Sequence, residues 1–177
     1  MTALAFTVQP QDSTVIWTGK KVTGTHSGTI KVTSGSVKVK DGIVEGGYIK
    51  FDTTSITVSD ITDPETNSQL KGHLLADDFF GADHFPIASF NIVSVTHKNG
   101  NDYDIIGKLT IKDITHDISF LATISLVDGL LTTKGIVTVD RTLYGMKFRS
   151  GNFFQNLGDT LISNDFILDI TLLATEV

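Results

Sequence analysis

Histidines are the side chains best suited to acid–base chemistry or metal binding in this sequence, because the chain contains no cysteine. The five histidines form neither a His-Glu-x-x-His pair nor a cluster with the ligand spacing of a zinc site. His73 and Asp77 are four residues apart, a spacing that puts two side chains on one face of a helix. A metal ion needs three or four ligands, so this isolated pair is better interpreted as a structural contact. The sequence therefore predicts no metal site.

Nucleophilic catalysis has equally weak support in the sequence. Ser27 follows His26, but neighbouring residues on a strand point to opposite faces of a sheet. The chain has no Gly-x-Ser-x-Gly elbow, no Gly-x-Gly-x-x-Gly fingerprint and no phosphate-binding P-loop. We therefore predict no catalytic residue and no cofactor. An enzyme that uses His26 or His73 as a base on an amphiphile stays open as the weakest of three functional hypotheses.

Arginine occurs only twice, as Arg141 and Arg149. Arg141 follows Asp140 at the expected end of a strand, shortly before Tyr144. In one interpretation Arg141 and Tyr144 contact the polar headgroup of an amphiphilic ligand. In the other, Arg141 pairs with a carboxylate and holds the structure together, as guanidinium groups commonly do. The residues alone favour the structural pair.

The elements that position these side chains are expected to be strands. The chain has 18 Ile, 14 Val and 24 Thr but only 7 Ala, and β-branched side chains favour a pleated sheet over a helix. This composition disfavours a helical bundle, and the sequence lacks the strand–helix alternation of a doubly wound α/β enzyme. At 177 residues and 40% hydrophobic content, the chain is expected to fold as one all-β domain over residues 1–177.

Apolar residues alternate with polar ones along most of the chain, the pattern typical of strands. Asp41-Gly42, Asn99-Gly100 and Asp128-Gly129 are strong hairpin-turn signals between such runs. Ser34-Gly35-Ser36 also predicts a turn, in a hairpin with outward-facing lysines, and Gly46-Gly47 predicts a bulge or a sharp bend. The runs expected to be strands are 14–18, 29–33, 37–40, 48–52, 86–92, 102–111, 118–126, 131–139 and 164–173.

Two segments interrupt this pattern. In the segment 61–85, Asp63 followed by Pro64 predicts a helix that Asp63 caps, and leucines follow at helical spacing. The residues 76–80 could add a further short helical turn. The segment 144–162 is rich in Gly and Asn and contains several Phe residues, including Phe153 and Phe154. A connection of this length is typical of a lid, a cavity mouth or another functional loop.

Several strands carry apolar residues on both faces, as Ile105 and Ile106 do in the strand 102–111. A single sheet buries one face, so a second layer, a second subunit or a ligand must cover the surplus. The expected inward face mixes large residues such as Phe90 with small ones such as Gly107 and Gly135. This mixture suits either a tapering barrel with a filled core or an elongated cavity for an apolar ligand, and the residues alone do not decide between them.

The charge distribution argues against nucleic acid as a partner. The net charge is −6, and the aromatic residues do not interleave with basic ones. No apolar run approaches the ~20 residues of a transmembrane helix. The first residues lack the basic and long apolar regions of an export signal, so the chain as written is expected in the cytoplasm. A processed periplasmic protein would have the same sequence features.

A series of short motifs, each weak alone, is specific in its order and spacing. In chain order they are Gly24-Thr25-His26-Ser27-Gly28, Asn67 with Leu70 and His73-Leu74, Asp78-Phe79-Phe80, Pro86-Ile87-Ala88-Ser89-Phe90, Gly107-Lys108-Leu109-Thr110-Ile111, and Asp140-Arg141 with Tyr144-Gly145. Together they resemble the YceI-like family of polyisoprenoid-binding proteins, over roughly residues 14–174. One departure is Asp113, where family members commonly have Gly after the Leu-Thr-Ile-Lys stretch. We expect only a local change, because Asp tolerates positive φ better than β-branched residues do.

The resemblance implies a lipocalin-like, extended antiparallel β-barrel of about eight strands, with short helical structure between about 61 and 85. It also implies a bacterial protein that binds a long isoprenoid or similar amphiphilic chain inside the barrel, with no established catalytic step, and that forms homodimers in some members. Our first hypothesis is therefore non-catalytic binding, storage or transport of a polyisoprenoid, an isoprenoid quinone or a fatty-acyl chain. The alternative is an interaction protein, a sandwich or barrel with a filled core and no lipid ligand.

The first hypothesis assigns residues to the ligand. Arg141 and Tyr144 are the candidate headgroup contacts. The inward parity of the strands and the segment before Pro86 supply the expected cavity wall, which consists of Trp17, Ile30, Ile49, Phe51, Leu74, Phe79, Phe80, Phe90, Leu109, Ile111, Phe120, Ile124, Phe166 and Leu168.

Overall fold

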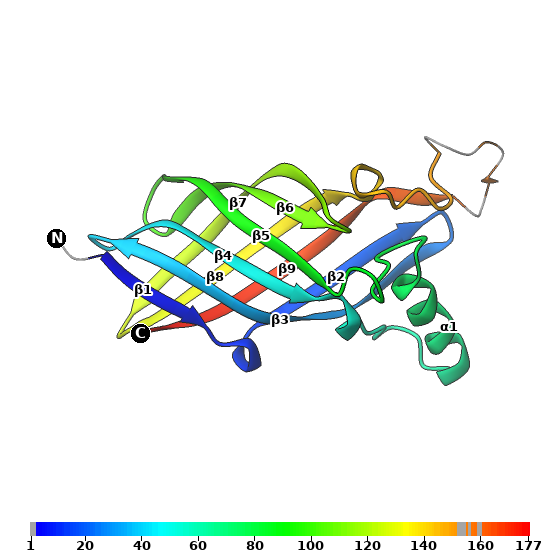
Figure 1. Ribbon diagram of the computed structural model, residues 1–177, viewed down its shortest axis with the longest axis horizontal. Helices are drawn as coiled ribbons and strands as arrows, with labels where there is room; N and C mark the ends of the chain where they lie inside the picture. The colour runs from blue at the N-terminus through cyan, green and yellow to red at the C-terminus, as the bar shows by residue number, and fades with distance from the viewer. Residues whose placement is uncertain (1–2, 152–154, 156, 159–160) are drawn as a thin grey trace.

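The computed structural model describes residues 3–151, 155, 157–158 and 161–177. Within these residues the alternating pattern forms nine strands and one α-helix, α1, at Pro64–Leu75 (Figure 1). Three short 3-10 turns, η1 to η3, cover Pro10–Asp12, Thr53–Ser55 and Arg141–Tyr144. The strands are β1 Ala3–Val8, β2 Thr14–Lys21, β3 Gly24–Lys40, β4 Ile43–Asp52, β5 Ile87–His97, β6 Asp102–Ile111, β7 Ile114–Val127, β8 Leu130–Asp140 and β9 Ile162–Glu176.

The strands close into an antiparallel barrel, as predicted. Around the barrel the order is β3-β2-β9-β8-β7-β6-β5-β4, and pairing of β4 with β3 completes the ring. The short strand β1 pairs with the end of β3 and with the end of β9. Because β2 pairs with other parts of the same two strands, β1 and β2 together fill one position, interrupted by η1. The barrel therefore has eight strand positions around its axis.

The turn predicted at Ser34-Gly35-Ser36 is wrong. Residues 24–40 form one continuous strand, whose register against β4 shifts between Val32 and Ser34. Gly35 accommodates β1 instead of turning the chain, because a Cβ at this position would lie 2.8 Å from Val8 Cγ2. The bulge predicted at Gly46-Gly47 is confirmed by a second register shift, between Lys38 and Val39.

The tight hairpins follow the predicted turn chemistry. Asp41-Gly42 and Asp128-Gly129 each have positive φ at both residues, as a type I′ turn requires. The β6–β7 turn has the same character without glycine, since Lys112 and Asp113 have φ of 55° and 60°. Asp113 thus keeps the hairpin geometry that glycine would favour.

Helix α1 begins as the sequence predicts. Asp63 caps it by accepting a hydrogen bond from the Thr66 amide at 2.9 Å, and Pro64 lies at its first position. The residues 76–80 form hydrogen-bonded turns and not a further turn of helix. No residue of α1 is buried, and its leucines are half-buried against the edge of the core. No helix among the described residues is long and apolar enough to cross a membrane.

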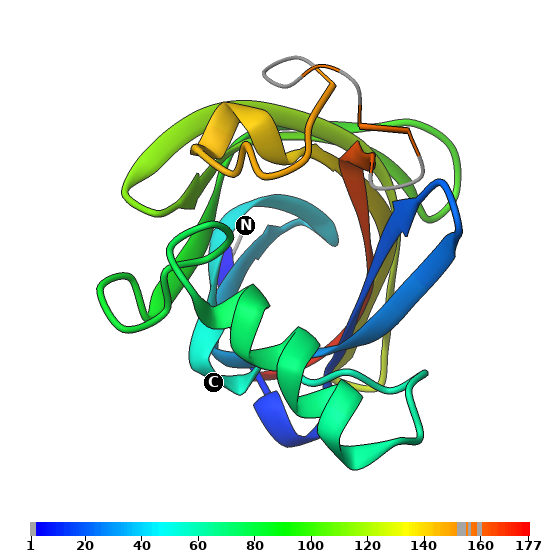
Figure 2. The same ribbon diagram turned by 90° about the vertical axis from the view of Figure 1, so that its right-hand side faces the viewer.

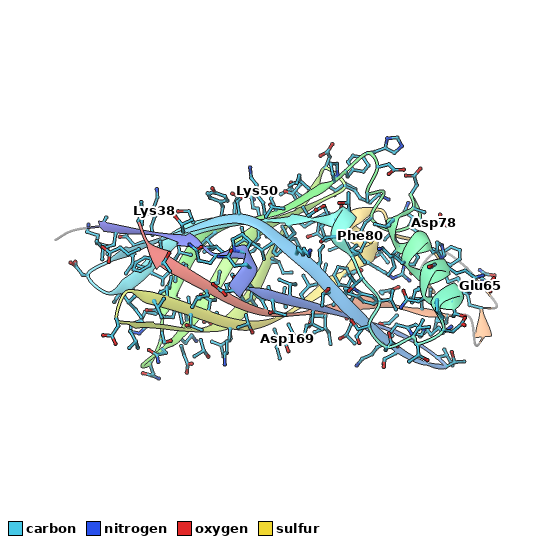
Figure 3. All side chains as sticks on the ribbon, turned by 90° about the horizontal axis from the view of Figure 1, so that it is seen from below. Lys38, Lys50, Glu65, Asp78, Phe80 and Asp169 are labelled. Carbon is cyan, nitrogen blue, oxygen red and sulfur yellow. The ribbon has the colours of Figure 1, made fainter. Side chains whose placement is uncertain are left out.

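The two ends of the barrel differ. Both termini lie near one end, together with the turns at 41–42, 98–101 and 128–129, and we call it the far end (Figure 1). At the other end, the mouth, α1 lies across the opening in the view along the barrel (Figure 2). Lys38, Lys50 and Asp169 lie on the outer wall, whereas Phe80 lies between the barrel and α1 (Figure 3).

Candidate functional site

A mainly apolar cavity lies at the mouth, between the barrel and the segments that cover it. Its volume is about 250 Å³. Strands β2, β3 and β9 supply one side, and α1 with the turns that follow it and the segment 141–149 supply the rest. The wall is mainly apolar, with exposed charged side chains from Lys20, Lys21, Arg149 and Asp165 around it. The apolar side chains are Trp17, Leu70, Leu74, Phe79, Phe80, Met146, Phe148, Ile162 and Phe166.

Trp17 is held in the wall by a segment that is not a strand. Its Nε1 donates a hydrogen bond to the carbonyl oxygen of Thr57 at 2.8 Å. The segment 56–60 runs along the edge of β3, where the amides of Thr57 and Ser59 donate to the carbonyls of Thr29 and Ser27. Gly28 makes this close approach possible, because a Cβ there would lie 1.7 Å from the Thr57 oxygen.

The position of the segment 56–60 along β3 also explains the role of His26. Its Nδ1 lies 2.9 Å from Asp60 Oδ2, and the amide of Ser27 donates to Asp60 Oδ1 at 3.0 Å. Partial burial acts to raise the pKa of Asp60, but the hydrogen bonds from Ser27 and His26 outweigh it, so the pKa lies below its ordinary value. The motif His26-Ser27-Gly28 therefore fastens the segment 56–60 to β3.

His73 makes a second histidine–carboxylate contact at the mouth, with a different partner from the one predicted. Its Nε2 lies 3.2 Å from Asp78 Oδ2, and not against Asp77, because α1 ends at Leu75 before the expected i, i+4 pair is complete. The rings of Phe79 and Phe148 meet the His73 ring edge-on, with centroids 4.9 Å and 4.5 Å away. Among the described residues no group of three or more His, Asp or Glu side chains could hold a metal ion.

Arg141 lies in the wall of the mouth cavity and is only 3% exposed. Its guanidinium donates to the carbonyl oxygens of Ser163, Met146 and Ile162, at 2.9, 2.6 and 3.1 Å. The expected carboxylate pair is absent from these contacts, since the Asp140 side chain instead caps η3 by accepting from the Thr142 amide. Burial lowers the pKa of Arg141, and the nearby Asp140 charge partly offsets this effect. Arg141 thus ties η3 to the start of β9.

Tyr144, the other candidate headgroup contact, is 2% exposed and is not among the residues that line the mouth cavity. Its ring meets His116 edge-on, with centroids 5.3 Å apart. Burial raises its pKa to about 12, and the Asp140 charge adds to the effect. The structure therefore separates the two candidate headgroup residues, one in the cavity wall and one behind it.

Two smaller cavities continue from the mouth along the barrel axis. The first, of about 30 Å³, shares Trp17, Phe80 and Phe166 with the mouth cavity. The second, of about 50 Å³, shares Phe51 and Leu168 with the first. All the predicted wall residues line these three cavities. Leu74 and Phe79 line only the mouth cavity, and Trp17, Phe80 and Phe166 line the mouth cavity and the first inner cavity. The inner cavities are lined by Ile30, Ile49, Phe51, Phe90, Leu109, Ile111, Phe120, Ile124 and Leu168.

The small inward-facing residues do not leave open space. A Cβ at Gly107 would lie 2.4 Å from Phe90 Cζ, and one at Gly135 would lie 3.2 Å from Phe120 Cε2. The Phe90 and Phe120 rings, with centroids 5.6 Å apart, therefore occupy the room that the glycines provide. The inner part of the barrel is largely filled by side chains.

Sequence reasoning missed several wall residues of the mouth cavity. Met146 and Phe148 come from an irregular segment, where no alternation reports which side chains face inward. The concentration of Phe in the segment 144–162 was the available signal. Of these residues, Phe153 and Phe154 lie outside the described part of the chain.

Comparison with protein families identifies one match that spans most of the chain. The model of the YceI-like domain matches residues 6–174. Among curated proteins, a UPF0312 protein of Staphylococcus aureus (strain bovine RF122 / ET3-1) is 34% identical over 123 residues, which are 64% of this chain and 69% of the relative. A UPF0312 protein of the strain USA300 is 33% identical over the same length.

Solved structures share the fold at low sequence identity. BcnA of Burkholderia cenocepacia superposes with a TM-score of 0.76 and 20% identity, covering 95% of this chain and 99% of that one. A polyisoprenoid binding domain from Saccharophagus degradans, implicated in plant cell wall breakdown, gives 0.69 and 13%, covering 98% and 99%. The YCEI protein of Campylobacter jejuni gives 0.59 and 21%, covering 76% and 74%.

Proposed function

Because this chain belongs to the YceI-like family, we propose that it binds a long-chain apolar or amphiphilic ligand inside its barrel and stores or transports it without catalysing a reaction. The ligand class is a polyisoprenoid, an isoprenoid quinone or a fatty-acyl chain. The observation that carries the proposal is the apolar mouth cavity of about 250 Å³, which is continued inward by smaller apolar cavities. The name of the Saccharophagus degradans domain supports the same ligand class.

Binding is driven by the removal of the ligand tail from water. Each buried CH₂ contributes about 0.8 kcal/mol, so ten carbons contribute about 8 kcal/mol before the cost of ordering the ligand. The mouth cavity accepts the first part of the tail. Deeper entry requires the Phe80 and Phe166 rings to turn aside, since both line the mouth cavity and the cavity below it.

A polar headgroup is proposed to stay at the mouth. Arg141 uses three of its N–H groups on backbone carbonyls, and a guanidinium carries about five. The remaining donors suit an oxygen of the headgroup. Tyr144 is the weaker candidate because it lies outside the lining of the mouth cavity.

The alternative function, an interaction protein with a filled core, is favoured by the outer wall. Ile106, Leu121 and Ile136, on the neighbouring strands β6, β7 and β8, are 42%, 56% and 63% exposed. An apolar outer wall suits a protein partner. This alternative predicts that apolar ligands leave the melting temperature unchanged.

The test uses protein purified from cells and extracted with organic solvent, followed by mass spectrometry. A co-purifying isoprenoid, quinone or fatty-acyl compound is expected. Trp17 gives a second readout, because it is the only tryptophan and lines the mouth cavity, so geranylgeraniol or palmitate should change its fluorescence saturably. A clean extract together with unchanged fluorescence and melting temperature would contradict the proposal.

A further inference from the structure

The far end of the barrel holds a cavity whose chemistry differs from that of the mouth. Its volume is about 150 Å³, and its walls come from the β3–β4 and β5–β6 turns and the adjoining strands. His97, Asn101 and Tyr103 bring polar side chains to it. Val44 and Ile124 line both this cavity and the apolar cavity of about 50 Å³ on the axis. A polar space thus adjoins the inner end of the apolar one.

Tyr103 is the buried polar group of this cavity. It is only 4% exposed, and its hydroxyl has no hydrogen-bond partner among the described residues. Yet no fully enclosed side-chain nitrogen or oxygen in that part of the chain lacks a partner. The Tyr103 hydroxyl must therefore keep contact with open space, and the cavity that Tyr103 lines provides it.

His97 supplies the complementary function. Its Nε2 lies 2.7 Å from the carbonyl oxygen of Gly100, so Nε2 carries the hydrogen, because a carbonyl can only accept. In the neutral ring Nδ1 is then an acceptor. The ring also packs against Tyr103, with centroids 4.7 Å apart, which keeps the two side chains together.

The charge of the lining limits the ligand. No Asp, Glu, Lys or Arg is among the described residues that line this cavity. A charged group would meet no counter-charge in this lining, whereas a hydroxyl or carbonyl finds both a donor and an acceptor.

We propose that the far-end cavity is a second binding site, which takes an uncharged hydroxyl or carbonyl group against Tyr103 and His97. Two sources offer this chemistry. One is the polar tip of a chain that lies along the barrel axis, in which case the site deepens the proposed function and rests on it. The other is a separate small alcohol or phenol.

The experiment is a titration of ¹⁵N-labelled protein with phenol and, separately, with 1-decanol, followed by amide chemical shifts and Trp17 fluorescence. Saturable shifts are expected at Gly42, Gly100 and Tyr103. Tyr103→Phe removes one neutral hydrogen bond and should weaken far-end binding about three- to tenfold. Tyr48→Phe is the matched control, because Tyr48 is 37% exposed on the outer wall.

The outcomes separate the sources and the two proposals. Far-end shifts with 1-decanol that weaken in Tyr103→Phe support the chain tip, and shifts with phenol alone support a separate small compound. Far-end shifts without any response of Trp17 to 1-decanol support this site and count against the proposed function. A Trp17 response without far-end shifts overturns the site, which then holds solvent only. Should Tyr103→Phe fail to fold, the amide chemical shifts of the wild-type protein decide whether the site exists, since saturable shifts at Gly42, Gly100 and Tyr103 support it and their absence overturns it.

Discussion

The ring of Phe80 meets the ring of Phe166 at 68°, with centroids 6.1 Å apart. Phe166 belongs to β9, whereas Phe80 comes from the turns that follow α1. Both rings line the mouth cavity and the smaller cavity below it, so the pair forms part of the partition between the two. Opening this partition should decide how much of a ligand tail enters the barrel.

Removal of the Phe80 ring tests this role. Phe80→Ala should join the two cavities and increase the affinity for long straight-chain alcohols more than for short ones. Removal of this half-buried ring should lower the unfolding free energy by about 1–3 kcal/mol. Affinity is measured by Trp17 fluorescence across a series of chain lengths, and stability by urea unfolding.

Phe85→Ala is the matched control, because Phe85 lies in the same segment and lines none of the three cavities along the axis. It should leave the dependence on chain length unchanged. Equal gains for short and long chains in Phe80→Ala would show that the ring does not divide the interior.

The fastening of the segment 56–60 can be tested at Gly28. Gly28→Ala puts a Cβ within 1.7 Å of the Thr57 oxygen and 2.7 Å of Trp17 Nε1, so the segment must move away from β3. The unfolding free energy should fall by about 3 kcal/mol, as in an overpacked core, and the fluorescence of Trp17 should shift toward the red as its environment opens.

Gly19→Ala provides the comparison on the paired strand. The only neighbour that its Cβ would meet within 4 Å is a Trp17 ring atom at 3.8 Å, an ordinary contact. It should change stability by less than about 1 kcal/mol. If Gly19→Ala and Gly28→Ala destabilise the protein equally, close approach of the segment is not the reason for glycine at position 28.

Acid should loosen the same segment. The pKa of Asp60 in the folded protein lies below its ordinary value of 3.8, because hydrogen bonds from Ser27 and His26 outweigh the effect of burial. A depressed carboxyl pKa contributes stability above the unfolded value, and this contribution is lost as the pH falls from 3.8 through the folded pKa. Melting temperatures of the wild type should therefore fall in this window.

Asp60→Asn should show a smaller fall in melting temperature over that window and a lower melting temperature at neutral pH. Asp83→Asn is the control, since Asp83 is exposed and its side chain has no hydrogen bond within the described chain. An unchanged acid profile in Asp60→Asn would assign the acid sensitivity to other carboxyl groups.

The alternation of apolar residues predicted most of the strands and the inward parity along them, whereas the closed barrel was implied by the family resemblance and β1 was not predicted. Phe166 and Leu168, for example, are two apart on one strand and line the same inner cavity. Local signals failed where distant parts of the chain set the geometry. Gly35 looked like a turn residue, but β1 packs over it. Gly107 left open whether the interior is filled, and Phe90 of the neighbouring strand fills the space beside it.

The site was predictable to a similar extent. Trp17 and Phe80 follow from strand parity and from the motif around position 80. The hydrogen bonds of Arg141 do not, since its acceptors are backbone carbonyls, which every residue type carries. The far-end cavity depends on how two turns and the strands beside them come together, and no periodic pattern records that arrangement.

The β6–β7 turn offers a stabilising substitution. Asp113 has φ of 60°, in the left-handed region where a side chain other than glycine is strained. Asp113→Gly should remove this strain and raise the unfolding free energy by up to about 1 kcal/mol, less the entropy that glycine adds to the unfolded chain.

Asp117→Gly is the contrasting control on the adjoining strand, because Asp117 has ordinary strand geometry and accepts a hydrogen bond from Lys108 at 2.8 Å. That control should lower stability, since glycine weakens a strand interior. Urea unfolding of both variants measures the difference, and a loss of stability in Asp113→Gly would mean that the backbone strain at Asp113 is smaller than the entropy cost of glycine and any contact of the Asp113 side chain together.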